Sequence, residues 1–226
     1  MNIAIIPARG GSKRIHKKNI KIFRGKPMIA YSIETASKSK NIEKVIVSTD
    51  SKEIANIAME FGALVPFMRG KELSDNMTST VPVIANAIKM LIELDWEIDN
   101  VCCIYPCTPL LKSKSIDNIY ELFNSKNEDF AFPVIQYPHP ILRALRMLDS
   151  GKMEFLFPEN ELTRTQDLET FYHDAGQFYW GTSNAWLKHK KMHTDGIGVQ
   201  INPWEAVDID DKGDWEKAEF LKKLFQ

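Results

Sequence analysis

Residues 3 to 19 read IAIIPARGGSKRIHKKN. The continuous apolar run from Ile3 to Ile6 is typical of a strand that is buried on both faces. Two glycines follow it, and a turn that contains glycines lets backbone amides point inward at an anion. Five lysines or arginines fall within the ten positions from Arg9 to Lys18 and supply the counter-charge. The stretch therefore predicts a strand that ends in a loop suited to a phosphate ester.

Short apolar runs alternate with amphipathic segments along the following chain. Strands are expected at 45–48, 64–68, 101–105 and 130–135, and helices at 29–36, 54–61, 84–91 and 116–123. Apolar strands separated by helices indicate a mostly parallel sheet that is covered by helices on both sides. The expected fold class is therefore α/β with three layers, and ligands in such a sheet bind beyond the carboxyl ends of the strands.

The basic loop differs from the two common nucleotide-binding loops. It has no glycine directly before a Lys-Ser/Thr pair, as a P-loop requires, and its glycine spacing does not fit a dinucleotide fingerprint. A solvated basic turn, or a basic patch for nucleic acid or nuclear import, is the alternative. Its place directly after the first strand of a parallel sheet favours the phosphate site.

The alternation stops between residues 137 and 170, where prolines and a glycine interrupt mixed segments. A long surface meander explains these residues poorly, because many of them are apolar. We interpret the segment as an excursion from the sheet, either a lid or a dimerisation arm, within one domain that spans residues 1–226. Beyond it, strands are expected at 177–180, 197–201 and 207–210, and a closing helix at 214–225.

The global composition limits the partners of the protein. The chain has 226 residues, and 29 Lys and Arg against 30 Asp and Glu give a net charge of −1, so we expect neither nucleic acid nor a membrane as a partner. No apolar run has the length of a membrane span, and the first one carries no basic leader, so no secretory signal is expected. The three cysteines, Cys102, Cys103 and Cys107, are interpreted as buried packing residues of a cytoplasmic protein.

A second charged cluster lies near the C-terminus. If the segment around Asp208 and Asp210 is extended, both carboxylates point to one side, and together they suit Mg²⁺. The spacing to Gly213 and Glu219 also fits parts of a calcium-binding EF-hand loop, but the preceding residues are of strand type where that motif needs a helix. A solvated turn in which Asp214 caps the last helix remains the simpler alternative.

With both clusters in view, the chain resembles the CMP-sugar synthetases, a family of cytidylyltransferases that activate acidic nonulosonic sugars. The likeness rests on motifs that follow one another along nearly the whole chain, at Ala8 to Asn19, Val47 to Asp50, Arg69 to Asp75, Tyr105 to Leu110, Arg164 to Asp167, Gly176 to Tyr179, and Asp208 to Asp210. The resemblance implies a Rossmann-like sheet, a single nucleotidyltransferase domain and a homodimer. It also implies that a sugar hydroxyl attacks the α-phosphorus of CTP and releases pyrophosphate, with Mg²⁺ as cofactor.

The resemblance assigns roles to individual residues. Nucleotide contacts are implied for Ala8, Arg9, Gly10, Gly11, Ser12, Lys13, Lys18, Asn19, Arg69 and Ser79. Metal ligation is implied for Asp208 and Asp210, and Arg9, Lys18 and Asp210 are the candidates for catalytic roles. No general base is evident, so Asp210 is a candidate for assisting the sugar hydroxyl, with a metal-bound hydroxide or direct metal activation of the sugar as alternatives. The expected sugar-binding residues are Tyr105, Arg143, Arg164, His173 and Gln177. The two arginines among them are the candidates for the sugar carboxylate, because arginine holds a carboxylate through two parallel hydrogen bonds.

Two departures from the sialate-specific members bear on the sugar. The chain has Tyr105 where they usually have Gln, and His173-Asp-Ala-Gly176 where they have Arg-x-Asn-Gly. The segment from Tyr172 to Gly181 is similar to the bacterial branch that acts on pseudaminic acid, a nine-carbon acidic sugar that decorates flagellin. Synthetases for sialic, legionaminic or deoxyoctulosonic acid remain alternatives. A non-catalytic nucleotide- or RNA-binding protein is the rival of another class, and it predicts widespread basic charge.

Overall fold

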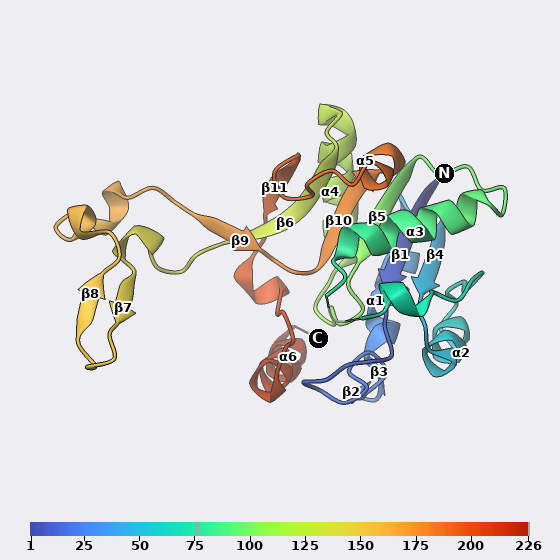
Figure 1. Cartoon of the computed structure of the whole chain (residues 1–226), viewed down its shortest axis with the longest axis horizontal. Coiled ribbons are helices and arrows are strands. Elements are labelled where there is room, and N and C mark those ends of the chain that lie inside the picture. Colours follow the sequence, from blue (N-terminus) through green and yellow to red (C-terminus); the bar gives the residue numbers. More distant parts are fainter. Residues whose placement is uncertain (76, 226) are drawn as a thin grey trace.

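The computed structural model describes residues 1–75 and 77–225. Seven strands form its central sheet, in the order β11-β6-β10-β5-β1-β4 with β9 paired to β6 (Figure 1). They are β1 (Asn2–Pro7), β4 (Lys44–Ser48), β5 (Asn100–Ile104), β6 (Phe130–Gln136), β9 (Tyr172–Asp174), β10 (Phe178–Thr182) and β11 (Gly196–Gln200). Strands β4, β1 and β5 are parallel neighbours, as are β6 and β11, whereas β10 and β9 run antiparallel. The expected mostly parallel sheet is confirmed.

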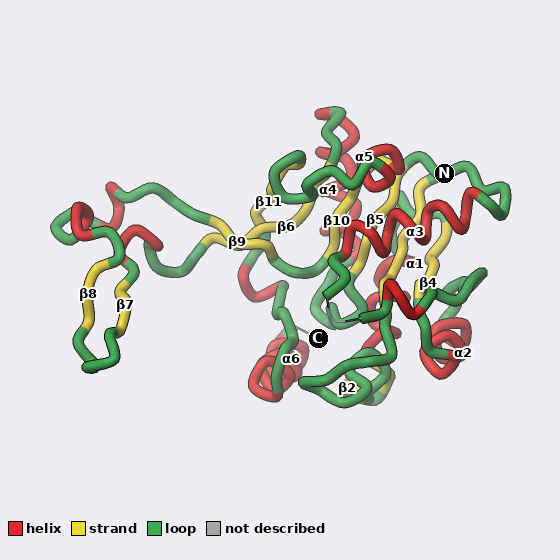
Figure 2. Tube along the Cα trace, viewed as in Figure 1, coloured by secondary structure: helices red, strands yellow, loops and turns green. Residues whose placement is uncertain are grey.

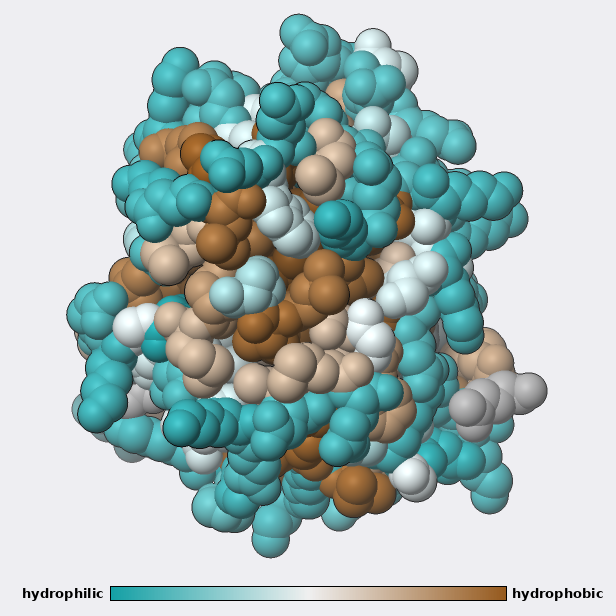
Figure 3. Space-filling view, turned by 90° about the vertical axis from the view of Figure 1, so that its right-hand side faces the viewer, coloured by the Kyte–Doolittle hydropathy of each residue, from teal (hydrophilic) through white to brown (hydrophobic). Residues whose placement is uncertain are grey.

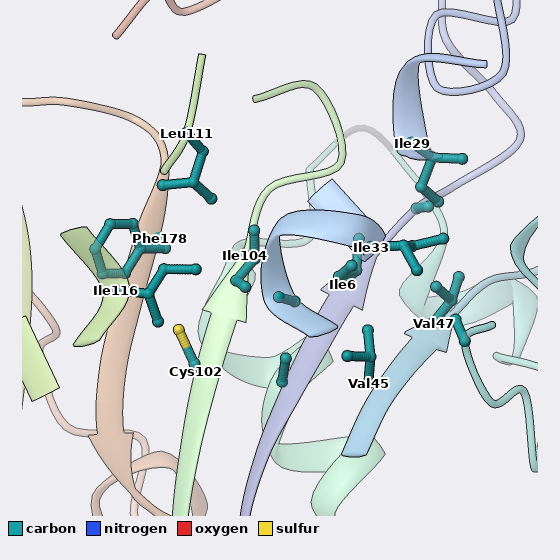
Figure 4. Close-up of a cluster of buried hydrophobic side chains, with 14 of the residues drawn as sticks. Ile6, Ile29, Ile33, Val45, Val47, Cys102, Ile104, Leu111, Ile116 and Phe178 are labelled. Atoms are coloured by element: carbon teal, nitrogen blue, oxygen red, sulfur yellow. The ribbon is translucent and has the colours of Figure 1, made fainter. Parts of the chain in front are cut away.

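Helices cover both faces of the sheet. They are α1 (Met28–Ser37), α2 (Lys52–Glu60), α3 (Thr80–Ile92), α4 (Ser113–Lys126), α5 (Ser183–Leu187) and α6 (Lys212–Leu224). The first, second and fourth share one buried cluster with the sheet, and the third and fifth share another. Figure 4 shows the first of these clusters, in which Ile33 lies close to Ile6 and Val47. The three-layer α/β architecture is therefore confirmed.

Two tryptophans fix helices against the sheet. The indole of Trp180 donates to the carbonyl of Ile116 in α4 at 3.1 Å, and the indole of Trp186 in α5 donates to that of Val101 at 3.3 Å. A side chain at Gly181 would meet the rings of Phe130 and Trp186 at 2.6 Å, so only glycine allows this close packing. The absence of a side chain at Gly181 thus lets β10 pack closely against Phe130 of β6 and Trp186 of α5.

Two expected strands are absent from the described structure. Residues 64–68 make only one bridge, from Leu64 to Ile46, because Pro66 has no N–H to donate and the chain then turns so that the amide of Arg69 reaches Thr49. Residues 207–210 pair with no strand either, but they keep the expected alternation: the side chains of Val207 and Ile209 are buried.

The last helix begins slightly earlier than expected. The Asp211 side chain caps α6 by accepting from the amide of Asp214 at 3.0 Å, and the Asp214 side chain accepts from the amide of Asp211 at 3.1 Å. Asp214 thus takes part in a reciprocal cap with Asp211, where the alternative interpretation of this segment had Asp214 as the cap.

Residues 137–171 leave the sheet after β6 and return in β9. Figures 1 and 2 show this segment, hereafter the arm, projecting from the body of the molecule. It contains the hairpin of β7 (Leu145–Met147) and β8 (Met153–Phe155), with the short 3-10 helices η2 (Ile141–Arg143), η3 (Pro158–Asn160) and η4 (Thr165–Asp167). Its exposed apolar side chains include Leu145, Met147, Met153, Leu156 and Leu162.

The remaining elements lie near the basic loop or on the body surface. They are the hairpin β2 (Ile22–Phe23) and β3 (Lys26–Pro27), and the 3-10 helices η1 (Lys71–Leu73) and η5 (Pro203–Glu205). Where α2 and the end of α3 face outward, hydrophilic side chains surround a smaller apolar area (Figure 3). No helix in the described part of the chain is long and apolar enough to cross a membrane.

A third buried cluster joins the two ends of the chain. The basic loop contributes Ile15, the C-terminal segment contributes Val207 and Ile209, and α6 contributes Trp215. Phe23 packs edge-on against Trp215, with ring centroids 5.3 Å apart. This cluster carries the two charged segments that the sequence analysis singled out to the same edge of the sheet.

Candidate active site

A cavity of about 420 Å³ opens where β1 and β5 end. The basic loop, the residues before α3, the end of β5 and the C-terminal carboxylates all line it. Its walls are formed by Pro7, Arg9, Ser12, Lys13, Arg14, Ile15, Lys18, Asn19, Arg69, Leu73, Asp75, Thr78, Ser79, Thr80, Val83, Tyr105, Pro106, Asp208 and Asp210. The two clusters expected to act together therefore face one cavity.

The basic loop is held in shape by its backbone contacts. The amide of Gly10 donates to Asp50 Oδ1 at 2.8 Å, and a Cβ at Gly10 would stand only 3.2 Å from that of Ser51. The side-chain amide of Asn19 donates to the carbonyl of Arg9 at 2.9 Å. Ile15 is buried and anchors the middle of the loop. The cationic side chains of the loop therefore face the cavity or the solvent.

Cations of the loop contact the C-terminal segment directly. Arg14 Nη2 lies 2.6 Å from Asp210 Oδ1, and Lys18 Nζ lies 3.8 Å from the same oxygen. Lys18 also donates to the carbonyl of Ile209 at 2.6 Å. The half-buried lysine thus ties the loop to the C-terminal segment while its charge stays beside the carboxylates.

The two carboxylates influence each other. Desolvation raises the pKa of the Asp208 carboxyl, the neighbouring Asp210 carboxylate raises it further, and the charge of Lys18 opposes both effects. Hard oxygen donors of this kind suit Mg²⁺, which binds through one or two carboxylates, water and substrate phosphates. Among the described residues, no group of three or more His, Cys, Asp or Glu side chains forms a complete metal cage. The two carboxylates are donors of the kind and number that Mg²⁺ takes from a protein when water and substrate phosphates supply its other ligands.

An ion pair between a buried arginine and a half-buried aspartate supports the basic loop. The side chain of Arg69 is only 3% exposed, its Nη2 lies 4.0 Å from Asp50 Oδ1, and its Nε donates to Ser74 at 3.1 Å. Burial lowers the pKa of the Arg69 guanidinium, whereas the charge of Asp50 raises it. Asp50 therefore links Arg69 to the Gly10 amide, and the Arg69–Asp50 ion pair holds the start of the basic loop in position.

The segment before α3 closes the opposite wall. Arg9 Nη1 donates to the carbonyl of Asp75 at 2.6 Å, and Asp75 accepts from the amide of Thr78 at 2.7 Å. Hydrogen bonds from Thr78 and from the amide of Met77 lower the pKa of Asp75. In the described structure no side chain caps the first amides of α3, which begins after Ser79 at this wall. Such a helix terminus favours an anion.

A family model described as Cytidylyltransferase matches residues 3–196. The chain belongs to the cytidylyltransferase family. It is 41% identical to the pseudaminic acid cytidylyltransferase of Campylobacter jejuni over 99% of this chain and 97% of that protein. It is 30% identical to the CMP-N,N'-diacetyllegionaminic acid synthase of Legionella pneumophila over 99% of this chain and 97% of that one.

A solved structure shares the fold. A CMP:2-keto-3-deoxy-manno-octonic acid synthetase complexed with CTP superposes with a TM-score of 0.72 at 15% identity, covering 100% of this chain and 99% of that chain. This agreement confirms the Rossmann-like architecture. The protein is thus a cytidylyltransferase in family and in fold.

The structure gathers most of the expected nucleotide-binding residues of this cytidylyltransferase. Arg9, Ser12, Lys13, Lys18, Asn19, Arg69 and Ser79 line the cavity together with Asp208 and Asp210. Three others do not. Ala8 is fully buried and donates its amide to Ser48, Gly10 lines a small neighbouring hollow, and Gly11 is exposed. These three residues shape the loop.

The expected sugar-binding residues are dispersed in the single chain. Only Tyr105 lines the cavity. Gln177 is buried and donates to the carbonyl of Glu205 at 2.7 Å, and His173 Nδ1 lies 2.9 Å from the carbonyl of Asp174. Arg143 and Arg164 are exposed residues of the arm. Within one copy of the described chain, these four do not form one pocket with Tyr105.

The structure also tests the expectations for the three cysteines and for a calcium-binding loop. The three cysteines are buried and unpaired, and burial raises the pKa of Cys107 to about 12, which agrees with a packing role. Strand β11 stands where an EF-hand would need its entering helix, so that alternative is wrong.

Several cavity residues were not expected. Asp75, Thr78, Thr80 and Pro106 line it, and Asp50 holds the basic loop through the amide of Gly10. The position of Asp50, two residues after the end of β4, was the available signal, because the carboxyl ends of parallel strands carry ligand contacts.

Proposed function

We propose that this cytidylyltransferase transfers the cytidylyl group of CTP to pseudaminic acid and releases pyrophosphate. One observation carries the proposal: the basic loop and the Asp208–Asp210 pair line the same cavity, with Arg14 and Asp210 in contact at 2.6 Å. The sugar is supported by the similarity to the Campylobacter jejuni relative, whose name states that substrate. The enzyme would act in the cytoplasm. Its product would be a CMP-sugar for the glycosylation of flagellin or the cell surface.

The cationic side chains would bind the triphosphate. Lys13, Arg14 and Lys18 line the cavity on one side, and Arg9 and the first amides of α3 lie on the other. Donors that are already in place stabilise the charge that builds up on phosphate oxygens in the transition state. Arg9 and Lys18 are our candidates for this catalytic role. Holding both substrates in line further lowers the barrier, because the attack becomes effectively unimolecular.

Asp208 and Asp210 would hold Mg²⁺ against the phosphates. The ion, when bound, would polarise the phosphoryl oxygens as a Lewis acid. Asp210 is also our candidate for accepting the proton of the attacking sugar hydroxyl, because its carboxylate reaches the cavity. The same oxygen contacts Arg14 and Lys18, so these cations would orient the carboxylate.

We further propose that the enzyme is a homodimer formed through the arm. The arm projects from the body, and its exposed apolar side chains would find a covered place against a second copy (Figure 1). Arg143 and Arg164 lie on this arm and are absent from the walls of their own cavity. In a dimer they would reach the sugar carboxylate at the cavity of the partner.

The deciding assay measures pyrophosphate release from CTP. We expect turnover with pseudaminic acid and Mg²⁺, much less with legionaminic, N-acetylneuraminic and deoxyoctulosonic acids, and none after metal chelation. Exclusive turnover of one of the other sugars would replace the substrate assignment. Absence of turnover with every sugar, together with tight RNA binding, would favour the non-catalytic alternative.

A further inference from the structure

One peptide of the basic loop is held at both of its ends. It joins Arg9 to Gly10 and carries the carbonyl of the first residue and the amide of the second. The carbonyl accepts from Asn19 Nδ2 at 2.9 Å, and the amide donates to Asp50 Oδ1 at 2.8 Å. Because a peptide unit is planar, these two contacts together fix its orientation. The side chain of Arg9, which reaches the carbonyl of Asp75, starts from this fixed peptide.

The side chain of Asn19 bridges two segments. The residue is only 5% exposed, although it lines the main cavity. Its backbone carbonyl accepts from the amide of Ile29 in α1 at 2.8 Å. At the other end of its side chain, the thiol of Cys107 donates to Oδ1 at 3.2 Å. Asn19 therefore connects the peptide after Arg9 to the segment that follows β5.

The segment that follows β5 is itself fixed on α1. The hydroxyls of Ser32 and Thr108 lie 2.9 Å and 3.1 Å from the carbonyl of Tyr105, and both can donate to it. Cys107 stands between Tyr105 and Thr108 in the chain and packs in the same buried cluster as Ile15. Helix α1 thus holds both partners of the contact between Cys107 and Asn19.

The acceptor at Arg9 decides which way round the amide of Asn19 lies. A backbone carbonyl only accepts hydrogen bonds, so the amide nitrogen must face Arg9 and the amide oxygen must face Cys107. Cys107 therefore acts as the donor. Burial raises the pKa of the Cys107 thiol to about 12, against the opposing charge of Lys18, so the thiol keeps its proton at neutral pH.

We propose that Cys107 is a positioning residue for the nucleotide: its thiol proton fixes the amide of Asn19, and this amide holds the Arg9–Gly10 peptide in the orientation that binds the triphosphate. Cys107 acts through Asn19 and Arg9, in addition to its packing in the buried cluster. The inference rests on the CTP-binding part of the proposed function, because that part places the triphosphate at the basic loop.

Two substitutions at Cys107 separate positioning from packing. Calorimetric titration with CTP and Mg²⁺, without sugar, measures the affinity. Cys107→Ala removes the donor and should raise the Kd for CTP about fivefold, which corresponds to about 1 kcal/mol. Cys107→Ser keeps a donor and should stay within about twofold of the native Kd. Packing alone predicts the reverse order, because a hydroxyl is harder to bury than a methyl group.

A double-mutant cycle with Asn19→Ala tests the route of the effect. Asn19→Ala alone should raise the Kd for CTP about tenfold, because it frees the Arg9 carbonyl and removes a residue of the cavity wall. Adding Cys107→Ala to this variant should change the Kd by less than about twofold, since the thiol no longer has an amide to fix.

Cys103→Ala is the matched control. Cys103 is also a buried, unpaired cysteine, but it lies on β5 in the cluster that the sheet shares with α3 and α5. Its truncation removes the same sulfur atom and should leave the Kd for CTP within about twofold. If Cys107→Ala does not fold, Cys107→Val and Cys107→Thr take the place of the alanine and serine variants, because valine and threonine have similar shapes and only threonine has a donor.

The outcomes separate this inference from the proposed function. Equal Kd values for Cys107→Ala and Cys107→Ser, or an undiminished effect of Cys107→Ala in the Asn19→Ala variant, would overturn the inference and leave the reaction intact. A native protein that binds CTP but transfers it to no sugar would refute the proposed function, and the order of the two Cys107 variants would still decide the inference. A native protein that does not bind CTP would overturn both.

Discussion

Arg14 Nη2 and Asp210 Oδ1 lie 2.6 Å apart, although 196 positions separate the two residues in the chain. The contact exists because Ile15, one residue after Arg14, and Ile209, one residue before Asp210, share a buried cluster. Hydrophobic packing between the two ends of the chain therefore brings the cation and the carboxylate to one cavity.

Arg14→Ala should weaken CTP binding and leave the fold intact. The arginine side chain is 68% exposed, so the pair contributes at most about 1 kcal/mol to the free energy of unfolding. The KM for CTP should rise severalfold, because one phosphate-binding cation is lost, while the melting temperature changes little. Lys217→Ala, on the exposed face of α6, is the control. An unchanged KM would mean that Arg14 serves only to orient Asp210.

Asp210→Ala should reduce kcat by about a hundredfold or more, the scale of losing a group that stabilises the transition state. Pyrophosphate release at saturating CTP and Mg²⁺ measures this change. Glu216→Gln, an exposed acidic residue of α6, should retain full activity. Robust turnover by the Asp210 variant would remove the metal and base assignments.

Asp208→Asn should make the protein more stable and less active at pH 7. Below the pKa values of both the folded and the unfolded state, the Asp208 carboxyl is protonated in either state, so its ionisation does not affect the free energy of unfolding. Between the ordinary value of 3.8 and the raised value of the folded state, the folded chain holds a proton that the unfolded chain has lost. Stability therefore falls as pH rises through that window.

Melting temperatures from pH 3 to pH 7 check this assignment. The stabilising effect of Asp208→Asn should disappear as the pH falls toward the lower end. An effect of the same size at every pH would show that it arises from packing and that ionisation plays no part.

Asp50→Asn should destabilise the fold by about 2 kcal/mol, because it leaves the buried guanidinium of Arg69 without its anion. Asp99→Asn is the matched control, since Asp99 is 76% exposed in its ion pair with the N-terminal amine and should contribute little. Urea unfolding of both variants measures the difference. Equal effects would place the pair at Arg69 in the class of surface ion pairs.

Leu145→Lys combined with Met147→Lys should convert the proposed dimer into monomers. Both side chains are exposed on the hairpin of the arm, and burying a lysine in an apolar interface is costly. Sedimentation velocity distinguishes the two states. Leu224→Lys, which alters an equally exposed leucine of α6, should remain dimeric. A native protein that sediments as a monomer at micromolar concentration would refute the dimer.

The sequence was sufficient for the frame of the fold. Strands β1, β4, β5 and β6 follow continuous apolar runs, and their helices follow the helical spacing. The direction of β10 was not readable, because Phe178 to Trp180 looks the same in a parallel and an antiparallel strand. Pro66 was a readable sign against a full strand at 64–68, whereas the turn of the chain toward Arg69 is not encoded in the local pattern.

The parts of the site that consist of several charged residues close together in the sequence were predictable. The basic loop and the pair of aspartates could be found in this way. The role of Asp50 in holding the basic loop was missed. Its contacts with Gly10 and Arg69 join three segments that are separate in the sequence. The hydrogen bond from Tyr179 to Asp174 likewise exists only once β9 and β10 both pair with β6.

The central claim is that one triphosphate and one divalent ion share the cavity between the basic loop and the two C-terminal aspartates. A crystal structure with CTP and Mn²⁺ tests it most directly, because the anomalous signal of Mn²⁺ locates the ion independently of the nucleotide. We predict phosphates in contact with Lys13 and Lys18, and the ion between them and Asp208 and Asp210. Triphosphate density outside this cavity, or an ion away from both aspartates, would contradict the account.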